Sequence, residues 1–343
     1  MKIAIHHRPG SYSDRWIEYC KENDIPYKIV NAYDTDIVKQ VDDCTAFMWH
    51  HTHSDYRDKL FAKQLIYSLE AKGLKVFPDF NTTWHFDDKV GQKYLLEAIG
   101  APLVPSYVFY DKKEAIEWVN QTSFPKVFKL RGGAGAANVQ LVPTKKDAIR
   151  LVNKAFGKGF PQFNRRENLK ERIRKYKEGK DTLWGVCKGI GRLIIPTELE
   201  KMLGPEKGYV YFQDFIPNLS CDYRLQFVYR RCWAMIRKVR KNDFRASGSY
   251  DMYFDNENFP QNILDIAYSI VDRLKLQSAA FDFLKDKSDN IYLTEISYGF
   301  GVDIEVRNGK YYVEEFNHGY WDENKHRIEK AFNPLGWMVE IVK

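Results

Sequence analysis

Residues 124–141 read FPKVFKLRGGAGAANVQL, and this stretch constrains the fold more than any other in the chain. Apolar residues at 127, 128 and 130 predict a strand, which Lys126 and Lys129 interrupt with positive charge. Gly132, Gly133 and Gly135 follow, and a second β-rich run covers residues 138–142. Two strands joined by glycines predict a hairpin whose backbone N–H groups can approach an anion, because no Cβ blocks them. Lys129, at the end of the first strand, would then reach phosphates lying under the loop.

The glycines alone are equally typical of an ordinary flexible hairpin. The loop is not a P-loop, since no Gly-Lys-Ser/Thr follows it. It is not a Rossmann fingerprint either, because a strand pattern and not a helix pattern comes next. The lysine beside the glycines favours an anion site.

Composition limits the class of protein. The chain has 343 residues, enough for two or three domains. Of these residues 44% are apolar and 29% charged, as expected of a folded and not of a disordered chain. No apolar run approaches the roughly 20 residues of a membrane span, and the apolar part of the start, MKIAIHHRPG, is too short for a secretory signal. Five scattered cysteines without a Cys-x-x-Cys pair favour reduced thiols in the cytoplasm and disfavour structural zinc.

The first 80 residues alternate between strand and helix patterns. Apolar runs at 2–6, 27–30, 45–49 and 76–77 predict strands, and residues 12–22 and 54–71 predict helices. This alternation predicts a parallel, Rossmann-like sheet, whose ligands bind at the carboxyl ends of the strands. His50, His51 and His53 follow the third strand at such an end. Their spacing fixes no metal geometry, so we rank a polar loop first, substrate contact second and metal third.

The remaining chain mixes helices with antiparallel strand patterns. Asp87 or Asp88 can cap a helix that Gly100 ends, and residues 112–120, 144–156 and 263–274 predict three more helices. Residues 164–178 predict a basic helix, interpreted as a solvated face or lid in preference to a nucleic-acid site. Residues 209–216 predict a strand, and the alternation in 221–239 predicts a sheet with one charged face.

Asp282 and Glu295 lie inside two apolar strands, 278–284 and 290–297, that a polar turn joins. Two inward carboxylates repel each other unless a proton or a cation joins them. Oxygen ligands suit Mg²⁺ or Mn²⁺, which bridge to substrate phosphates. A salt-bridged pair at a sheet edge is the alternative interpretation.

This order of elements resembles the ATP-grasp superfamily, and most of all its glutathione synthetase/RimK-type ligases. The resemblance covers residues 2–301 and rests on five motifs in sequence order. It implies an α/β fold in which a Rossmann-like N-terminal domain precedes a two-part ATP-grasp domain. The implied boundaries are 1–80 for the first domain, 81–205 for the small ATP-grasp subdomain with the glycine hairpin and the basic insertion, and 206–343 for the large subdomain with the metal site and a C-terminal extension.

The resemblance also implies roles for single residues. Residues that match the ATP-binding positions are the phosphate-contacting Lys89 and Lys129, the loop glycines Gly132, Gly133 and Gly135, the adenine hinge Gln213, Asp214, Phe215 and Ile216, and the Asp-x-Arg aspartate Asp222. Residues that match positions at the reacting end are Arg224, Arg237 and Arg245. Asp282 and Glu295 match metal ligands, whereas Ser297 stands where the family usually has Asn. Ser247 replaces Asn in the same way, and a serine hydroxyl is a weaker ligand than an amide carbonyl.

The function that this resemblance implies is ATP-dependent ligation of a carboxylate to an amine through an acyl phosphate, with ATP and Mg²⁺ or Mn²⁺ as cofactors. An ATP-grasp kinase and a nucleotide-binding protein without chemistry are the alternatives. Small-molecule carboxylate and amine substrates are the expected partners, nucleic acid is disfavoured, and a homodimer is compatible with the sequence. Aromatic and acidic residues after Gly301, together with Trp49 and the three histidines, raise the hypothesis of a sugar acid or polysaccharide-linked substrate; packing of that extension on the core is the alternative.

Overall fold

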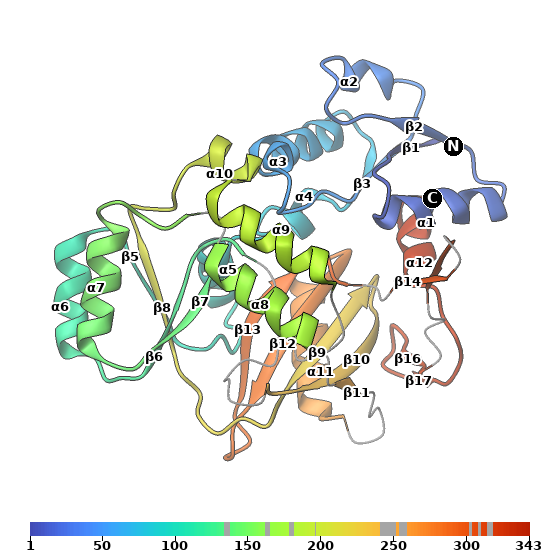
Figure 1. Cartoon of the computed structure of the whole chain (residues 1–343). Helices are drawn as coiled ribbons and strands as arrows, with labels where there is room; N and C mark the ends of the chain where they lie inside the picture. The colour runs from blue at the N-terminus through green and yellow to red at the C-terminus, as the bar shows by residue number, and fades with distance from the viewer. Residues whose placement is uncertain are drawn as a thin grey trace.

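The computed structural model describes residues 1–133, 138–161, 165–177, 182–195, 197–240, 252–253, 259–301, 304–307, 310–313 and 318–343. Within those ranges it is a mixed α/β structure with three main sheets, as the sequence predicts (Figure 1). No helix in the described ranges is both long and apolar enough to cross a membrane.

The first sheet is parallel, in the order β2-β1-β3-β4. Its strands are β1 (Ile3–His6), β2 (Tyr27–Val30), β3 (Ala46–Trp49) and β4 (Lys75–Phe77). The helices that accompany them are α1 (Tyr12–Glu22), α2 (Ile37–Gln40), α3 (Tyr56–Ala71) and α4 (Phe80–Thr83). The strands β1 and β3 are buried on both faces, which explains their uninterrupted apolar character.

The C-terminal helix α12 (Pro334–Val342) returns to this first sheet, as Figure 1 shows. Leu335, Met338 and Val339 share one apolar core with Trp16 of α1 and Ile5 of β1. The end of the chain is therefore part of the core around the first sheet.

The second sheet is antiparallel, in the order β5-β8-β6-β7. It contains β5 (Ser106–Phe109), β6 (Lys126–Lys129), β7 (Val139–Val142) and β8 (Val210–Asp214). The predicted hairpin is β6 and β7. Helices α6 (Lys112–Gln121) and α7 (Lys145–Ala155) pack on one face of this sheet, where Phe128 and Phe212 meet Val119 and Val152. Helix α5 (Lys89–Ala98) leads into this part of the chain.

Between α7 and β8 the described residues form α8 (Arg165–Lys177), α9 (Leu183–Ile194) and α10 (Glu198–Leu203). The sequence pattern predicts the first of them and misses the other two. Gly185, Gly189 and Gly191 lower the intrinsic helix propensity of α9, and its helical state depends on packing against α8.

The third sheet has the order β13-β12-β9-β10-β16-β17, and β11 pairs with β10. Its strands are β9 (Cys221–Val228), β10 (Arg231–Lys238), β11 (Met252–Tyr253), β12 (Ser278–Lys285), β13 (Ile291–Ser297), β16 (Tyr320–Trp321) and β17 (Arg327–Ile328). Helix α11 (Gln261–Leu274) packs on one face, and β14 (Ile304–Arg307) and β15 (Lys310–Val313) form a separate hairpin. Leu225, Phe227, Phe281 and Phe283 pack in the core with α11, so the polar side chains between them face the other way.

Candidate functional site

A cavity of about 460 Å³ lies between the second and third sheets and reaches the loop after β3. Gln213 and Asp214 at the end of β8, with Phe215 and Ile216 just beyond, line one part of it. Gln213 is held in place because its Nε2 donates to Ser106 Oγ over 3.0 Å. The chain leaves the sheet just after Asp214.

Strand β6 places Lys129 in the cavity. Val127 and Lys129 line the cavity, whereas Phe128 and Leu130 pack in the core with α6 and α7, as the period of two along a strand requires. Lys129 is only 7% exposed, and the described residues offer its ammonium no hydrogen bond or ion pair. Burial therefore lowers the pKa of Lys129 to about 8, although Glu295 nearby acts in the opposite direction.

Lys89, the first residue of α5, connects the glycine hairpin to the third sheet. Its buried Nζ lies 3.1 Å from Glu295 Oε1 and donates to the Gly133 carbonyl oxygen over 2.9 Å. Burial by itself would lower the pKa of Lys89, but the charges of Glu295 and Asp87 raise it. Lys89 is thus a permanent cation at the start of the glycine loop.

Asp87 fixes the start of that loop from the other side. Its Oδ1 accepts the Gly133 N–H over 2.6 Å, and its Oδ2 lies 3.1 Å from Lys59 Nζ. A Cβ at position 132 would come within 2.8 Å of Asp87 Oδ2, so the approach requires Gly132. The helix cap belongs to Asp88, whose Oδ1 accepts the Gly91 N–H.

The third sheet presents a network of arginines and carboxylates to the cavity. Asp282 of β12 lies in register with Arg224 of β9 on one side and with Glu295 of β13 on the other. Asp282 Oδ1 is 2.7 Å from Arg224 Nη1 and 2.9 Å from Arg237 Nη2. Burial alone would raise the pKa of Asp282, but the charges and hydrogen bonds of Arg224 and Arg237 outweigh it and lower the pKa. Asp282 is therefore ionised.

Arg237 stands behind this surface. Its Nε and Nη2 donate to the two carboxylate oxygens of Asp222 over 2.7 and 2.6 Å, and the side chain is 9% exposed. Asp222, Arg224 and Asp282 line the cavity, whereas Arg237 is not among the described residues that line it. Burial raises the pKa of Asp222 to about 6, although Arg237 acts in the opposite direction. Arg237 is placed to orient both Asp222 and Asp282.

Both predicted metal ligands thus have cationic partners. Asp282 contacts Arg224 and Arg237, and Glu295 contacts Lys89. In the described part of the chain no group of three or more His, Cys, Asp or Glu side chains could hold a metal ion. Two carboxylates on a cavity wall nevertheless suit Mg²⁺, which completes its shell with waters and phosphate oxygens. Ser297, which also lines the cavity, donates its hydroxyl to the Gly299 carbonyl oxygen over 2.6 Å and keeps lone pairs for a ligand.

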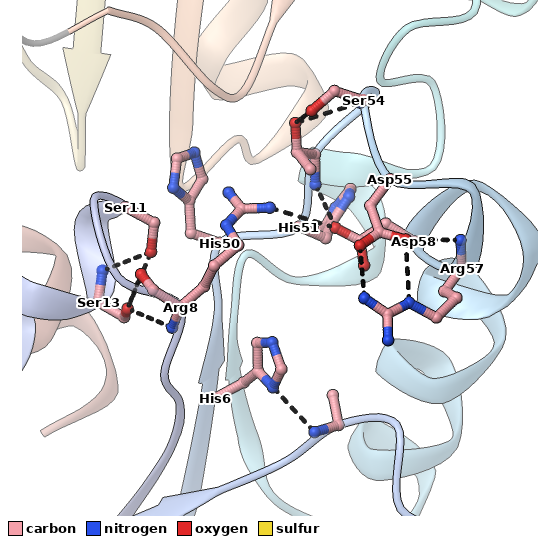
Figure 2. Close-up of polar contacts among 12 residues, drawn as sticks. His6, Arg8, Ser11, Ser13, His50, His51, Ser54, Asp55, Arg57 and Asp58 are labelled. Carbon is pink, nitrogen blue, oxygen red and sulfur yellow. Dashed lines mark hydrogen bonds and ion pairs between the residues drawn. The ribbon is translucent and has the colours of Figure 1, made fainter. Parts of the chain in front are cut away.

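The far end of the cavity is the loop after β3, where His50, His51 and His53 lie. Figure 2 shows the first two of these histidines. Burial, reinforced by the charge of Arg8, lowers the pKa of His50 well below its usual range and that of His51 to about 3. The Tyr12 N–H donates to His50 Nδ1 over 3.2 Å, so the neutral ring carries its proton on Nε2. This end of the cavity offers neutral imidazoles.

Hydrogen bonds and an ion pair connect the loops at this edge. The carboxylate of Asp58 accepts the Thr52 N–H and the Tyr33 hydroxyl, each over 2.6 Å. Arg8 Nη1 approaches the same carboxylate to 3.7 Å (Figure 2). The Tyr298 hydroxyl donates to the His51 carbonyl oxygen, which joins the loop after β13 to the first sheet. The carboxyl edge of the first sheet therefore continues the cavity wall.

Three comparisons with known proteins bear on this arrangement. No protein-family model and no curated protein matches the sequence. Among solved structures, a RimK domain ATP-grasp protein from Sphaerobacter thermophilus superposes with a TM-score of 0.52 at 14% identity, over 86% of this chain and 90% of that one. The chain has the ATP-grasp fold.

Two further ATP-grasp structures give the same result. D-alanine–D-alanine ligase from Bacillus anthracis superposes with a TM-score of 0.54 at 11% identity, over 87% of this chain and 86% of that one. The biotin carboxylase domain of 2-oxoglutarate carboxylase from Hydrogenobacter thermophilus, solved with MgADP, gives 0.57 at 13% identity, over 99% of this chain and 69% of that one. At these identities the likeness is one of fold.

The ATP-grasp fold brings most of the predicted site residues to one cavity. Those that line it are Lys89, Lys129, Gly133, Gln213, Asp214, Phe215, Ile216, Asp222, Arg224, Asp282, Glu295 and Ser297. Gly132 lies at its edge against Asp87, and Arg237 lies behind it. Gly135 and Arg245 lie outside the described residues.

Sequence reasoning missed the part that Asp87 and Phe86 play. Phe86 lines the cavity and packs against Tyr298, while Asp87 holds Gly133. The signal was the doubled Asp87-Asp88 before α5, since a helix needs only one N-cap and the second carboxylate is free for another role.

Proposed function

We propose that this chain is an ATP-dependent ligase that joins a carboxylate to an amine through an acyl phosphate. The observation that carries the proposal is the convergence of two buried lysines and an arginine with two carboxylates in one cavity: Lys89 and Lys129, Arg224, and Asp282 and Glu295. Cations at fixed positions neutralise a triphosphate, and carboxylates beside them suit its metal ion.

ATP would lie along the cavity from the hinge to the glycine loop. The segment Gln213–Ile216, at the end of β8 and just beyond it, would contact adenine. The phosphates would meet Lys129, whose ammonium has no partner among the described residues, and Lys89. The Gly133 N–H, held by Asp87 in the ligand-free protein, is a further donor for them.

Asp282 and Glu295 would hold Mg²⁺, with Ser297 as the third candidate ligand. The bound ion would supply charge neutralisation on the phosphate oxygens. To bind it, Glu295 must share or release Lys89, whose ammonium is then available to a phosphate. Arg237 orients Asp222 and helps to lower the pKa of Asp282, so we assign it a positioning role in place of the role at the reacting end that the family resemblance implies.

In the first chemical step, a carboxylate oxygen of the substrate attacks the γ-phosphorus and the bond to the β-phosphate oxygen breaks, which gives an acyl phosphate and ADP. The amine nitrogen of the second substrate then attacks the acyl carbon, phosphate leaves and the amine proton passes to solvent. Arg224 lines the cavity beside Asp282 and can stabilise the transferring phosphoryl group. We retain Arg245 as a proposed second holder of the acyl phosphate.

The substrates would enter from the histidine end. Neutral His50, with its proton on Nε2, can donate to a carbonyl or hydroxyl oxygen, and Phe86 gives this end an apolar side. Hydroxyl-rich acids such as sugar acids fit these donors, so this end supports the sugar-acid hypothesis. The C-terminal aromatics support it less, because Trp321 is buried in the core and Tyr320 packs on Phe332.

Hydroxylamine trapping tests the proposal. Sugar acids and amino acids are incubated with ATP, Mg²⁺ and hydroxylamine, and hydroxamate and ADP are measured together. We expect hydroxamate with the correct acid, and its loss in Arg245→Ala with ATP binding retained. A phosphorylated product that resists hydroxylamine would identify a kinase, and ATP binding without ADP release for any acid would identify a nucleotide-binding protein without chemistry.

A further inference from the structure

Residues 165–194, which include helices α8 and α9, account for most of the net positive charge of the protein. Ten basic and four acidic residues lie in this segment, a surplus of six, while the whole chain has a formal net charge of +7. The two helices lie side by side in front of the sheets, as Figure 1 shows in green and yellow-green. We call this segment the basic hairpin.

The packing between the two helices determines which face of α9 is turned outward. A Cβ at Gly189 would lie 2.9 Å from Arg172 Cδ and 3.1 Å from Leu169 Cδ1, so α9 contacts α8 through this glycine. Arg172 Nη1 also donates to the Gly185 carbonyl oxygen over 3.0 Å. The glycine face of α9 is therefore turned to α8, and its larger side chains point elsewhere.

Those larger side chains are apolar and exposed. Leu183 is 62% exposed, Trp184 67% and Ile190 52%, and Cys187 between them is exposed as well. Spacings of three, four and seven residues place them on one stripe of the helix. An ordinary surface helix turns such a stripe toward the core. Because these apolar side chains are exposed, the stripe is suited to a partner.

Basic residues border the stripe. Lys188 Nζ lies 5.5 Å from the centre of the Trp184 ring, and Arg192 follows one turn later. On α8, Ile173 and Tyr176 are exposed among the lysines and arginines of that helix. The partner must therefore accept aliphatic and aromatic side chains and carry negative charge in the same place.

We propose that the basic hairpin docks on an anionic lipid surface. Leu183, Trp184 and Ile190 would enter the boundary between headgroups and acyl chains, and the flanking basic side chains would meet the headgroups. A second copy of this chain is disfavoured, because it would bring two strongly positive hairpins together. Nucleic acid offers phosphates but no apolar phase for leucine and isoleucine. The proposal does not depend on the proposed ligase activity.

Vesicle co-sedimentation of the full chain tests this docking. We expect binding to phosphatidylcholine vesicles that contain phosphatidylglycerol, little binding to phosphatidylcholine alone, and weaker binding as salt is raised. Leu183→Asp removes an apolar contact and adds a negative charge, and should lower the lipid affinity by about tenfold or more. The matched control is Leu60→Asp on α3, since Leu60 is 63% exposed and lies outside the hairpin. An unchanged melting temperature in both variants shows that they fold.

Three results would overturn the proposal. The first is no co-sedimentation with anionic vesicles, as expected if the stripe binds an acidic protein. The second is equal loss of binding in Leu183→Asp and Leu60→Asp. The third is lipid-free self-association of the wild type that Leu183→Asp abolishes, because the stripe would then join two copies of the chain.

Discussion

Replacing Lys129 by methionine should stabilise the ligand-free protein and, at the same time, weaken its binding of ATP. Lys129 is buried without a hydrogen bond or ion pair in the described structure, and its pKa falls from 10.5 to about 8. Since one pH unit corresponds to about 1.4 kcal/mol, burial of the charged form costs the folded state about 3 kcal/mol at neutral pH. Methionine fills similar space without this cost, so the free energy of unfolding should rise by up to about 3 kcal/mol.

The pH dependence follows from the same numbers. The unfolded chain holds its lysine proton up to about pH 10.5, whereas the folded chain releases it near pH 8. Between these values the unfolded state binds more protons, so the stability of the wild type rises with pH and the advantage of Lys129→Met disappears. ATP binding has the opposite trend, because only the charged lysine attracts phosphate, and the affinity of the wild type should fall above about pH 8.

Urea unfolding at neutral and at alkaline pH, with calorimetric titration of MgATP, measures both effects. The matched control is Lys126→Met in the same strand, where Lys126 is equally buried but lies 2.6 Å from Asp214. That change leaves a carboxylate without its partner and should destabilise the protein by about 2 kcal/mol. We expect ATP affinity to fall about 10- to 100-fold in Lys129→Met. Loss of stability in Lys129→Met at neutral pH, or unchanged ATP affinity, would refute the reasoning.

Three further substitutions test the rest of the site. Glu295→Gln removes a proposed metal ligand, so it should abolish Mg²⁺-dependent ATP turnover and leave nucleotide binding measurable in a titration. It also removes the charge partner of buried Lys89 and should lower the melting temperature. Normal turnover would mark Asp282 and Glu295 as structural. Arg237→Met removes the bidentate partner of buried Asp222 and one of the two arginine partners of Asp282, and urea unfolding should show a loss of about 3–5 kcal/mol; an unchanged stability would exclude the positioning role. Trp321→Ala should lower the free energy of unfolding by about 3–5 kcal/mol and leave MgATP affinity intact, because Trp321 is a core residue. A stable variant that fails to bind a sugar substrate would contradict this.

The sequence by itself determined the local structure and much of the site. The alternation of apolar and polar residues in β6, β9 and β12 fixes which side chains share a face, because successive residues of a strand point to opposite sides. That rule put Lys129 on the opposite side from Phe128, and Asp282 on the opposite side from Phe281 and Phe283. The capping carboxylates and the glycines likewise marked helix ends and the hairpin turn.

Only the tertiary structure decided which of these groups meet. Strand β8 inserts between β5 and β6 although about 80 residues separate it from β6, and no local pattern encodes that pairing. The partners of the charged groups depend on this assembly: Arg237 binds two carboxylates, and Lys89 binds Glu295 across more than 200 residues. A charged residue in a strand shows that a partner is required, because a buried charge is costly alone, but only the packing of the sheets selects the partner.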